Sequence, residues 1–509
     1  MKINQIFNII IQGKLTGYIL TLISAIVYFL SFAPFTMGYT AFFSLIPFFY
    51  ALSKTGAFKK AALTGAIWGV ALSILFSIPL YYALVTEYEF SILFSTLLIF
   101  FTAYIPYAVI YGAFGISFIY FFKRRNIYFP FIAASLWVLV DYTMNITPFF
   151  LPWGYAGYSQ ASNIFIQISD ISGIFGVTFI IVLINLLLTG IKINKKEYLK
   201  FSISIILFII ISSAIYGNLR IQSINRTIRS SDKTEIKAAV IQGNFSSKEK
   251  WDSKNTAAVI NTYINMTKQV IGNADIIVWP ETVLNSSDSN NLEILSGISS
   301  LLKNKQFFIS GATRYDTKKI IYNSIFTADK RGLSYIYDKK ILFPFTETSL
   351  SGMSSGNFMD SPAIFNTGKT RSVYKNDSVI FGYTICFETI YPEYVRKIKN
   401  QGAEVLINVA NDSWFGNTYE PYMQLSNTIA RSVENRFYVL RSSNSGISAI
   451  ISPAGEVLSS VELNKRDKIV SSIKIMKIPS FYSKAGDWII VVSLLIIIIS
   501  LALQLKSKK

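Results

Sequence analysis

Residues 487–505 read Asp487-Trp-Ile-Ile-Val-Val-Ser-Leu-Leu-Ile-Ile-Ile-Ile-Ser-Leu-Ala-Leu-Gln-Leu505, and Asp487 is their only ionisable side chain. A helix of about 20 mostly apolar residues is long enough to cross the hydrocarbon core of a bilayer. Seven further apolar runs crowd the first 216 residues, at 17–32, 38–53, 60–84, 90–121, 127–147, 172–191 and 199–216. The sequence therefore predicts a polytopic α-helical membrane bundle of about eight transmembrane helices.

The stretch before this last run has ordinary globular composition. It alternates short β-branched runs with helical stretches such as 255–271 and 422–435. Some strand candidates are apolar throughout, as strands buried on both faces are. The candidates are Ile236–Gln242, Asp275–Trp279, Phe307–Gly311, Ser378–Ile385, Val405–Val409 and Val439–Ser442. This pattern predicts a layered α/β domain. The expected domains are a seven-helix membrane domain, a globular domain, and a last transmembrane helix with a basic tail, at 1–216, 217–486 and 487–509.

The loops between the apolar runs differ in charge. Basic residues follow the second, fourth and sixth runs and close the chain, at Lys54, Lys59, Lys60, Lys123, Arg124, Arg125, Lys192, Lys195, Lys196, Lys200, Lys506, Lys508 and Lys509. The intervening loops are almost free of Lys and Arg, and the loop 85–90 carries Glu87 and Glu89. By the positive-inside rule, the basic loops and both termini face the cytoplasm. The globular domain is then expected on the outer side.

Composition excludes several classes of protein. The formal net charge is +19, but much of the basic charge sits in the short loops, so nucleic-acid binding is not expected. The chain has no histidine, which excludes a Ser-His-Asp triad and removes the commonest metal ligand. It has one cysteine, Cys386, so no intrachain disulfide can form. Few ionisable residues lie within the apolar runs, Asp141 being the most notable, which disfavours a transporter or a receptor as the alternative.

Three segments of the globular domain place a reactive side chain at the end of an apolar strand. Glu281 lies in Val-Trp-Pro-Glu-Thr (278–282), Lys339 in Tyr-Asp-Lys-Lys (337–340), and Cys386 in Gly-Tyr-Thr-Ile-Cys-Phe-Glu (382–388). Taken singly, each could be a solvated carboxylate, a surface lysine or a small buried hydrophobe. Together they suit acyl transfer. A thiol needs a base or a positive charge to become a nucleophile, and without histidine that base has to be a carboxylate. A lysine can lower the thiol pKa and stabilise an oxyanion.

These segments carry a resemblance to a known family. The chain resembles the nitrilase (carbon-nitrogen hydrolase) superfamily, and more closely its membrane-bound branch, the apolipoprotein N-acyltransferases of the bacterial cytoplasmic membrane. The resemblance covers essentially the whole chain. The matching segments follow the family's order: Gln242-Gly243-Asn244, Lys250-Trp251, Trp279-Pro280-Glu281-Thr282, Tyr337-x-Lys339, Pro344-Phe345-x-Glu347, Ile385-Cys386-Phe387-Glu388 and Asn411-Asp412-Ser413-Trp414-Phe415-Gly416, with Pro152-Trp153 in the membrane part.

The resemblance implies both a fold and a set of site residues. The globular domain is expected to be an αββα sandwich. Cys386 is expected to be the nucleophile, Glu281 the proton acceptor and Lys339 the oxyanion ligand. Supporting roles are expected for Glu347, Glu388, Phe387, Trp251, Asn411, Trp414 and Trp153. The chain departs from the family pattern at Phe387, where the family usually has Tyr, at Thr346, where it usually has Gly, and in lacking the family's histidines.

The stretch 346–370 is rich in Ser and Gly and has no periodicity. A loop of this length in a compact domain is usually functional or disordered. Met353, Phe358 and Met359 are expected to form an apolar lid over the site, although they could instead pack on the domain's own core or belong to a passive connector.

The resemblance also implies the reaction. A membrane phospholipid is expected to donate its sn-1 acyl chain to Cys386, and the thioester is then attacked by the α-amino group of the N-terminal diacylglyceryl-cysteine of an apolipoprotein. The expected partners are therefore the phospholipid, the diacylated apolipoprotein and the membrane. No metal, nucleotide or organic cofactor is required. The alternative within enzymes is a membrane-anchored amidase that hydrolyses a small substrate.

Overall fold

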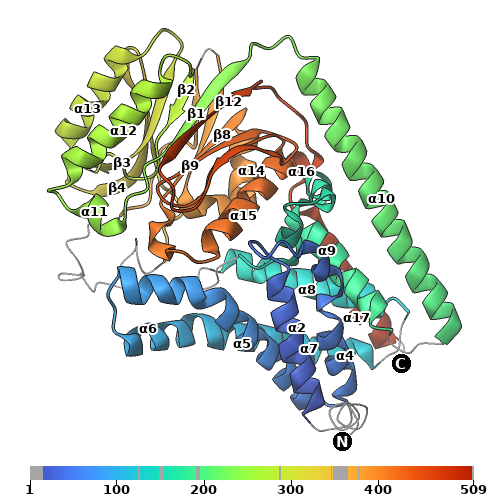
Figure 1. The fold of residues 1–509 in the computed structure, drawn as a ribbon. Coiled ribbons are helices and arrows are strands. Elements are labelled where there is room, and N and C mark those ends of the chain that lie inside the picture. The colour runs from blue at the N-terminus through green and yellow to red at the C-terminus, as the bar shows by residue number, and fades with distance from the viewer. Residues whose placement is uncertain are drawn as a thin grey trace, which may run out of the picture. The chain divides into compact units, whose positions relative to one another are not determined.

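The chain folds into two compact units, which are described separately (Figure 1). The computed structural model describes residues 15–123, 127–147, 153–190, 195–285, 288–344, 347, 365–376 and 378–506. One unit comprises Met1–Tyr81, Ser91–Leu219 and Ala485–Lys509, and the other comprises Tyr82–Phe90 and Arg220–Lys484. The predicted domain boundaries after 216 and 486 stay predictions.

The first unit is helical. Its helices are α2 (Thr16–Leu30), η1 (Gly38–Thr40), α3 (Ala41–Ser44), α4 (Ile46–Lys54), α5 (Phe58–Tyr82), α6 (Ile92–Ile99), η3 (Phe100–Tyr104), α7 (Ile105–Phe122), α8 (Phe129–Ile146), η4 (Ala156–Gln160), η5 (Ile164–Ile168), α9 (Ser169–Leu188), most of α10 (Lys195–Arg229) and α17 (Trp488–Lys506). Within the described part of the chain, six helical segments are long and apolar enough to cross a membrane: Phe58–Glu87, Ile92–Phe122, Phe129–Ile146, Ile164–Leu188, Glu197–Arg229 and Trp488–Lys506. This bears out the membrane class.

The two remaining predicted spans are shorter. Helix α2 has 15 residues, and the run 38–53 is divided among η1, α3 and α4. The division follows from Pro47 in the first turn of α4, because proline has no N–H to continue a helix from α3. Asn185 of α9 bridges the break between α3 and α4: its Oδ1 accepts from the N–H of Leu45 at 2.8 Å, and its Nδ2 donates to the carbonyl oxygen of Ala41 at 2.8 Å. The count of eight transmembrane helices therefore stays a prediction.

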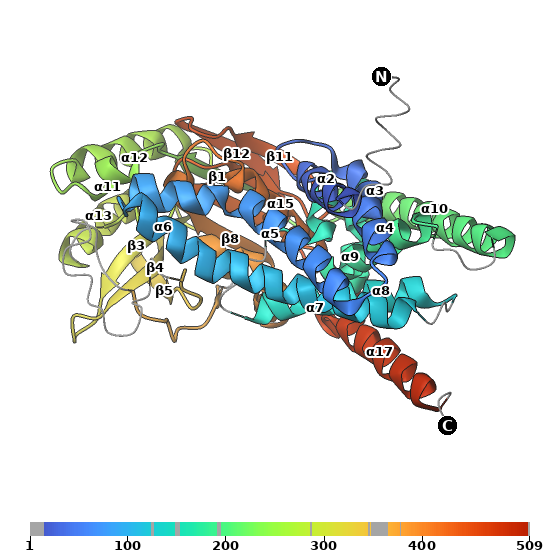
Figure 2. The ribbon, with the colours of Figure 1, turned by 90° about the horizontal axis from the view of Figure 1, so that it is seen from below.

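Helices α5 and α7 run side by side (Figure 2), and small residues allow their close approach. A Cβ added at Gly65 would overlap the carbonyl oxygen of Tyr111, and one added at Gly69 would overlap that of Tyr107. Likewise, a Cβ added at Gly115 of α7 would overlap the carbonyl oxygen of Ala61 of α5. Such close backbone contact replaces the hydrophobic driving force that is missing between helices in lipid.

The second unit contains two six-stranded sheets (Figure 1). The first has the order β12-β1-β2-β3-β4-β5, with bounds Asp467–Ile473, Ile236–Gln242, Ile276–Val278, Phe307–Tyr315, Ile321–Asp329 and Gly332–Asp338. The second has the order β11-β10-β9-β8-β7-β6, with bounds Val457–Val461, Ser448–Ile451, Tyr438–Ser443, Val405–Ala410, Ile380–Ile385 and Val373–Lys375. Strands β1, β2 and β3 are parallel to one another, as are β7, β8 and β9.

The unit has four layers. Because side chains alternate across a strand, Val240 of β1 joins the core between the sheets, whereas its neighbour Ile241 joins a second core beneath helices α12 (Thr256–Val270) and α13 (Asp288–Leu301). Helices α14 (Pro392–Asn400) and α15 (Glu420–Asn435) contact strands β7 and β9 of the other sheet. The order is helices, sheet, sheet, helices, as predicted for an αββα sandwich.

Candidate active site

Glu281, Lys339 and Cys386 lie beyond the carboxyl ends of β2, β5 and β7. Cys386 directly follows β7 and begins the 3-10 helix η6 (Cys386–Ile390). Its φ is 50°, in the left-handed region, and Thr282 beyond β2 and Asn244 beyond β1 have φ values of 48° and 51°. Non-glycine residues adopt this conformation rarely, and they do so mostly where the surrounding structure enforces it. These turns aim neighbouring side chains away from the strand axes.

Glu281 lies beyond the end of β2 and is 6% exposed. Its Oε1 accepts a hydrogen bond from Asn323 Nδ2 at 2.7 Å and lies 3.5 Å from Lys339 Nζ. Its N–H donates to the carbonyl oxygen of Ala410 in the second sheet, at 3.4 Å. The backbone of Glu281 is therefore tied to the second sheet, while one oxygen of its carboxylate is engaged by two donors from the side of the first sheet.

Lys339 follows β5 and is 1% exposed. Its Nζ donates to Glu347 Oε1 at 2.8 Å as well as facing Glu281. Burial alone would lower the pKa of Lys339, but the negative charges of Glu347 and Glu281, together with Cys386, raise it above its ordinary value. The ammonium therefore stays protonated. The Oε2 of Glu347 is held by the backbone N–H of Phe343 at 2.7 Å, which fixes the partner of the lysine.

Cys386 interacts electrostatically with both of these charges. Burial raises the pKa of its thiol, and the charge of Glu281 raises it further, whereas Lys339 acts in the opposite direction. Asp412 and Glu420 add smaller effects that also raise it. In the resting site the thiol thus keeps its proton, with a carboxylate and an ammonium within reach. This arrangement suits a reaction in which the base removes the proton only as the sulfur attacks.

Glu388 joins the cysteine turn to the lysine loop. This fully buried carboxylate accepts from the backbone N–H groups of Ile385 at 2.8 Å, Lys340 at 2.7 Å and Ile341 at 3.0 Å. The hydroxyl of Tyr337 also donates to it, at 2.7 and 2.8 Å to its two oxygens. Burial raises the pKa of Glu388, while these hydrogen bonds oppose the rise. Glu388 is therefore placed to position the lysine and the cysteine rather than to react.

Phe387 and Asn411, two further supporting residues, have different surroundings. Phe387 is buried, with its ring edge-on to Phe343 and to Tyr391 at centroid distances of 4.8 and 5.2 Å. Asn411 Oδ1 accepts from Ser413 and Asn444 at 2.9 and 3.0 Å.

Trp414 and Trp251, two of the predicted supporting residues, lie in short helices of the sandwich unit. The ring of Trp414 stacks on that of Tyr88 at 5.0 Å, and both residues belong to the same unit. Trp251 ends helix α11 (Ser247–Trp251), next to Lys250. Trp153 is buried in the other unit. The lid residues Met353, Phe358 and Met359 lie outside the described residues.

The structure adds residues that the sequence did not single out. Lys250 is 2% exposed, and its Nζ donates to the carbonyl oxygen of Glu281 at 2.5 Å and to Thr282 Oγ1 at 2.7 Å. Burial lowers the pKa of Lys250 to about 8, against smaller opposite effects of Glu281 and Cys386. Asn323 bridges Glu281 and Glu347, donating to the second at 3.1 Å. In the sequence, Lys250 is recognisable only as part of the Lys250-Trp251 motif, and Asn323 carries no signal, because it lies in β4, which the sequence pattern does not predict.

Two family profiles match the chain. The family profile described as Carbon-nitrogen hydrolase matches residues 237–479, and the one described as Apolipoprotein N-acyltransferase N-terminal domain matches residues 24–187. An apolipoprotein N-acyltransferase of Rickettsia bellii is 30% identical over 414 residues, which are 76% of this chain and 78% of the relative. The chain belongs to the apolipoprotein N-acyltransferase family.

A further relative matches nearly the whole chain, and a solved structure matches about half of it. The apolipoprotein N-acyltransferase of Rickettsia typhi is 28% identical over 96% of this chain and 97% of its own length. A Saccharomyces cerevisiae member of branch 10 of the nitrilase superfamily has a solved structure that covers 48% of this chain and 92% of its own, with 19% identity and a TM-score of 0.39.

Membership of the apolipoprotein N-acyltransferase family fits both units of the chain. This is an acyltransferase family of lipoprotein biosynthesis, and the two matched profiles fall on the apolar helices and on the sandwich respectively. Within the described residues, no group of three or more Cys, Asp or Glu side chains is arranged to hold a metal ion. The groups that the structure brings together at the site are the cysteine, the carboxylates and the lysines described above.

Proposed function

We propose that the protein transfers the sn-1 acyl chain of a membrane phospholipid, through a thioester on Cys386, to the α-amino group of the N-terminal diacylglyceryl-cysteine of apolipoproteins. This reaction is the last step of lipoprotein maturation. The observation that carries the proposal is the arrangement around Cys386, where a buried carboxylate and a buried ammonium lie 3.5 Å apart and both interact electrostatically with the thiol.

In the first half-reaction, Glu281 takes the proton from Cys386 Sγ as the sulfur attacks the ester carbonyl carbon. Lys339 stabilises the tetrahedral oxyanion, because its protonated ammonium is already fixed by Glu347. The bond between the carbonyl carbon and the glycerol oxygen then breaks. Glu281 returns the proton to that oxygen, and the lysophospholipid leaves.

In the second half-reaction, the amino group of the acceptor attacks the thioester carbonyl. Glu281 removes a proton from the nitrogen, the carbon–sulfur bond breaks, and the thiolate of Cys386 regains a proton. The net change converts an ester and an amine into an amide and an alcohol. Because the first product leaves before the acceptor reacts, the kinetics should be of the ping-pong type.

The proposed setting is the bacterial cytoplasmic membrane. Both termini would be cytoplasmic, eight helices would span the bilayer, and the sandwich would lie on the periplasmic or outer side. The basic loops support this orientation through the positive-inside rule. Both substrates are lipids whose chains remain in the bilayer, which gives a physical reason for an enzyme that is itself anchored there.

The test is direct detection of the acyl-enzyme. Purified protein is incubated with phospholipid that carries a labelled sn-1 chain, and the label should appear on Cys386 in a form released by hydroxylamine. Adding a diacylated lipopeptide should move the label into an amide. No label on the wild type, or the same label on Cys386→Ser, would overturn the proposal.

The same experiment separates the alternatives. A membrane-anchored amidase that hydrolyses a small substrate would either take no label from the phospholipid or release it as free fatty acid, and it would form no labelled amide on the lipopeptide. A transporter or a receptor with an outer ligand-binding domain would form no hydroxylamine-sensitive adduct at all. The excess of amide over free acid therefore measures how far the site transfers its acyl group rather than hydrolysing it.

A further inference from the structure

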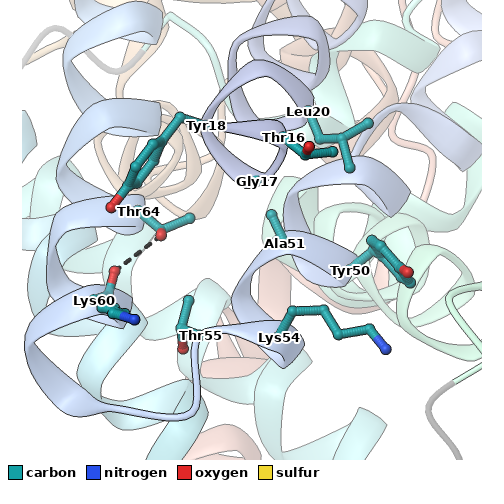
Figure 3. A pocket seen from close by; sticks show the side chains of 10 residues that line it. All are labelled: Thr16, Gly17, Tyr18, Leu20, Tyr50, Ala51, Lys54, Thr55, Lys60 and Thr64. Atoms are coloured by element: carbon teal, nitrogen blue, oxygen red, sulfur yellow. Dashed lines mark hydrogen bonds between the residues drawn. The ribbon is translucent and has the colours of Figure 1, made fainter. Parts of the chain in front are cut away.

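A cavity lies in the helical unit, at the end of α2, α4 and α5 where the basic segment 54–60 joins α4 to α5. Its volume is about 420 Å³, and Figure 3 shows the side chains that line it: Thr16, Gly17, Tyr18, Leu20, Tyr50, Ala51, Lys54, Thr55, Lys60 and Thr64. Small-molecule sites in proteins commonly have volumes of this order. The proposed acyl-transfer residues belong to the other unit, so the reaction above gives this cavity no role.

The polar part of the cavity suits an anion. The exposed side chains of Lys54 and Lys60 come from α4 and α5, and the hydroxyl group of Tyr18 adds a further donor. In Figure 3 the ring of Tyr18 points toward Thr64 and Lys60. The first acidic residue of the sequence is Glu87, so residues 1–86 offer no carboxylate to neutralise these lysines.

The apolar surroundings suit an acyl chain. Leu20 and Ala51 line the cavity, and α2 continues from it with Ile19, Ile23 and Ile26, which are 42%, 45% and 50% exposed. These three positions follow one another at helical spacing, and therefore form one apolar stripe that leads away from the lysines. A soluble anion would use only the polar end, whereas an amphiphile would use both.

We propose that this cavity binds the phosphate-bearing headgroup of an anionic phospholipid, whose acyl chains lie along the Ile19–Ile23–Ile26 stripe. Lysine ammonium groups bind phosphate as point charges, and hydroxyl groups complete its hydrogen bonds. On the proposed orientation, the bound lipid belongs to the cytoplasmic leaflet. The lipid there is a ligand and not the acyl donor, so the inference goes beyond the proposed function and does not depend on it.

The experiment measures lipid binding to the purified full-length chain by native mass spectrometry. Phosphatidylglycerol is titrated against phosphatidylcholine, for the wild type, for Lys54→Gln/Lys60→Gln, and for Lys59→Gln. Lys59 is the matched control, because it lies in the same loop but does not line the cavity. Thermal melting of the three proteins checks that they are equally folded.

The wild type should prefer phosphatidylglycerol, and the double variant should bind it roughly 25-fold more weakly, at about fivefold for each lysine near an anionic headgroup. Lys59→Gln should stay within about twofold of the wild type. Equal phosphatidylglycerol binding by the wild type and the double variant would contradict the proposed site. A loss of binding in Lys59→Gln as large as that in the double variant would also contradict it, because it would show that only the general surface charge matters.

A third arm separates the lipid from a soluble phosphate. Millimolar inorganic phosphate should fail to displace phosphatidylglycerol, because it cannot use the apolar stripe. Complete displacement of phosphatidylglycerol by inorganic phosphate would contradict the lipid proposal and favour a free phosphate as the ligand. Acylation of Cys386 is measured in parallel and should persist in the double variant. Loss of lipid binding with normal acylation supports the cavity, while normal lipid binding refutes it whatever the acylation result.

Discussion

Lys250 donates a 2.5 Å hydrogen bond from its Nζ to the main-chain carbonyl oxygen of Glu281. The same ammonium reaches Thr282 Oγ1, and Thr282 has the left-handed φ that turns the chain after β2. A buried lysine therefore holds the turn from which the proposed base projects. Its charge also interacts with those of Glu281 and Cys386, so it acts on the site both through geometry and through electrostatics.

Lys250→Met should lower the rate of Cys386 acylation by about 10- to 100-fold, because the Glu281 turn loses two donors and a small displacement of a base is costly. The pH profile should change as well. The pKa of Lys250 is lowered to about 8, so the wild type loses a positive charge beside Glu281 and Cys386 as the pH rises through about 8. A descending limb near that pH is expected in the wild type and not in the variant.

The stability of the wild type should change in the same pH range. Below about 8, Lys250 is protonated in both the folded and the unfolded chain. Between the pKa of about 8 and its ordinary value of 10.5, only the unfolded chain keeps the proton. The unfolded state then binds more protons than the folded state, so the free energy of unfolding increases as the pH rises. Melting measured from pH 7.5 to 9.5 should show a smaller rise in Lys250→Met. Identical activity profiles in the two proteins would leave Lys250 with a purely structural role.

Glu281→Gln should reduce acyl-enzyme formation at least about 10²-fold, the scale of losing a general base. The amide oxygen can still accept from Asn323, so the fold should change little and the melting temperature should stay close to that of the wild type. The rate is followed as hydroxylamine-sensitive label on Cys386 in single turnover. Turnover like that of the wild type would remove Glu281 from the mechanism.

Lys339→Ala should be inactive and also less stable, because it leaves the carboxylates of Glu281 and Glu347 buried without their cation. Adding Glu347→Gln removes one of these charges. The double variant Lys339→Ala/Glu347→Gln should therefore recover part of the lost melting temperature but none of the lost activity, which would remain at least about 10²-fold below the wild type. Activity that returned together with stability would show that Lys339 serves the fold alone.

The sequence predicted the centre of the sandwich and missed its edges for a physical reason. All six predicted strands correspond to β1, β2, β3, β7, β8 and β9, the parallel strands of the two sheets. Parallel strands covered on both faces are nearly continuous apolar runs. Missed strands such as β11 and β12 alternate largely between partly buried and exposed residues, with Ser, Lys and Asp among them, and resemble loops in a single sequence.

The site was predictable where a strand end carried a reactive side chain, and less so where the contact was made by the backbone. Glu281, Lys339 and Cys386 stood out because each follows an apolar run. The connection from Glu388 to the N–H groups of Lys340 and Ile341 could not be derived from spacing, since it joins segments that are 48 and 47 residues apart. The carbonyl contact of Lys250 is of the same kind. Such hydrogen bonds leave no trace in residue type.

The proposed orientation predicts a specific pattern of labelling. In a Cys386→Ser background, a cysteine at the exposed turn position Lys330 should react with an impermeant thiol reagent added to spheroplasts. A cysteine at Glu197, which is exposed at the start of α10, should react only after the membrane is permeabilised. The reverse pattern would overturn the orientation that the basic loops support.

Glu388→Gln tests whether one buried carboxylate positions the cysteine relative to the lysine. Glutamine offers a single oxygen acceptor and would present an NH₂ group to some of the four donors from Ile385, Lys340, Ile341 and Tyr337. Each buried donor left unpaired should cost about 1–3 kcal/mol, so the melting temperature should fall.

Acylation of Cys386 in Glu388→Gln should fall by more than about 10-fold even below the melting transition, since Lys339 is no longer fixed relative to the thiol. Glu393→Gln is the matched control: this carboxylate lies on α14, a few residues away, and pairs with Arg396 at 2.8 Å in a partly exposed position. It should behave like the wild type in both measurements, because partly exposed ion pairs contribute little. If Glu388→Gln were equally unaffected, the lysine loop would have to be held by other contacts, and the positioning role assigned to Glu388 would be wrong.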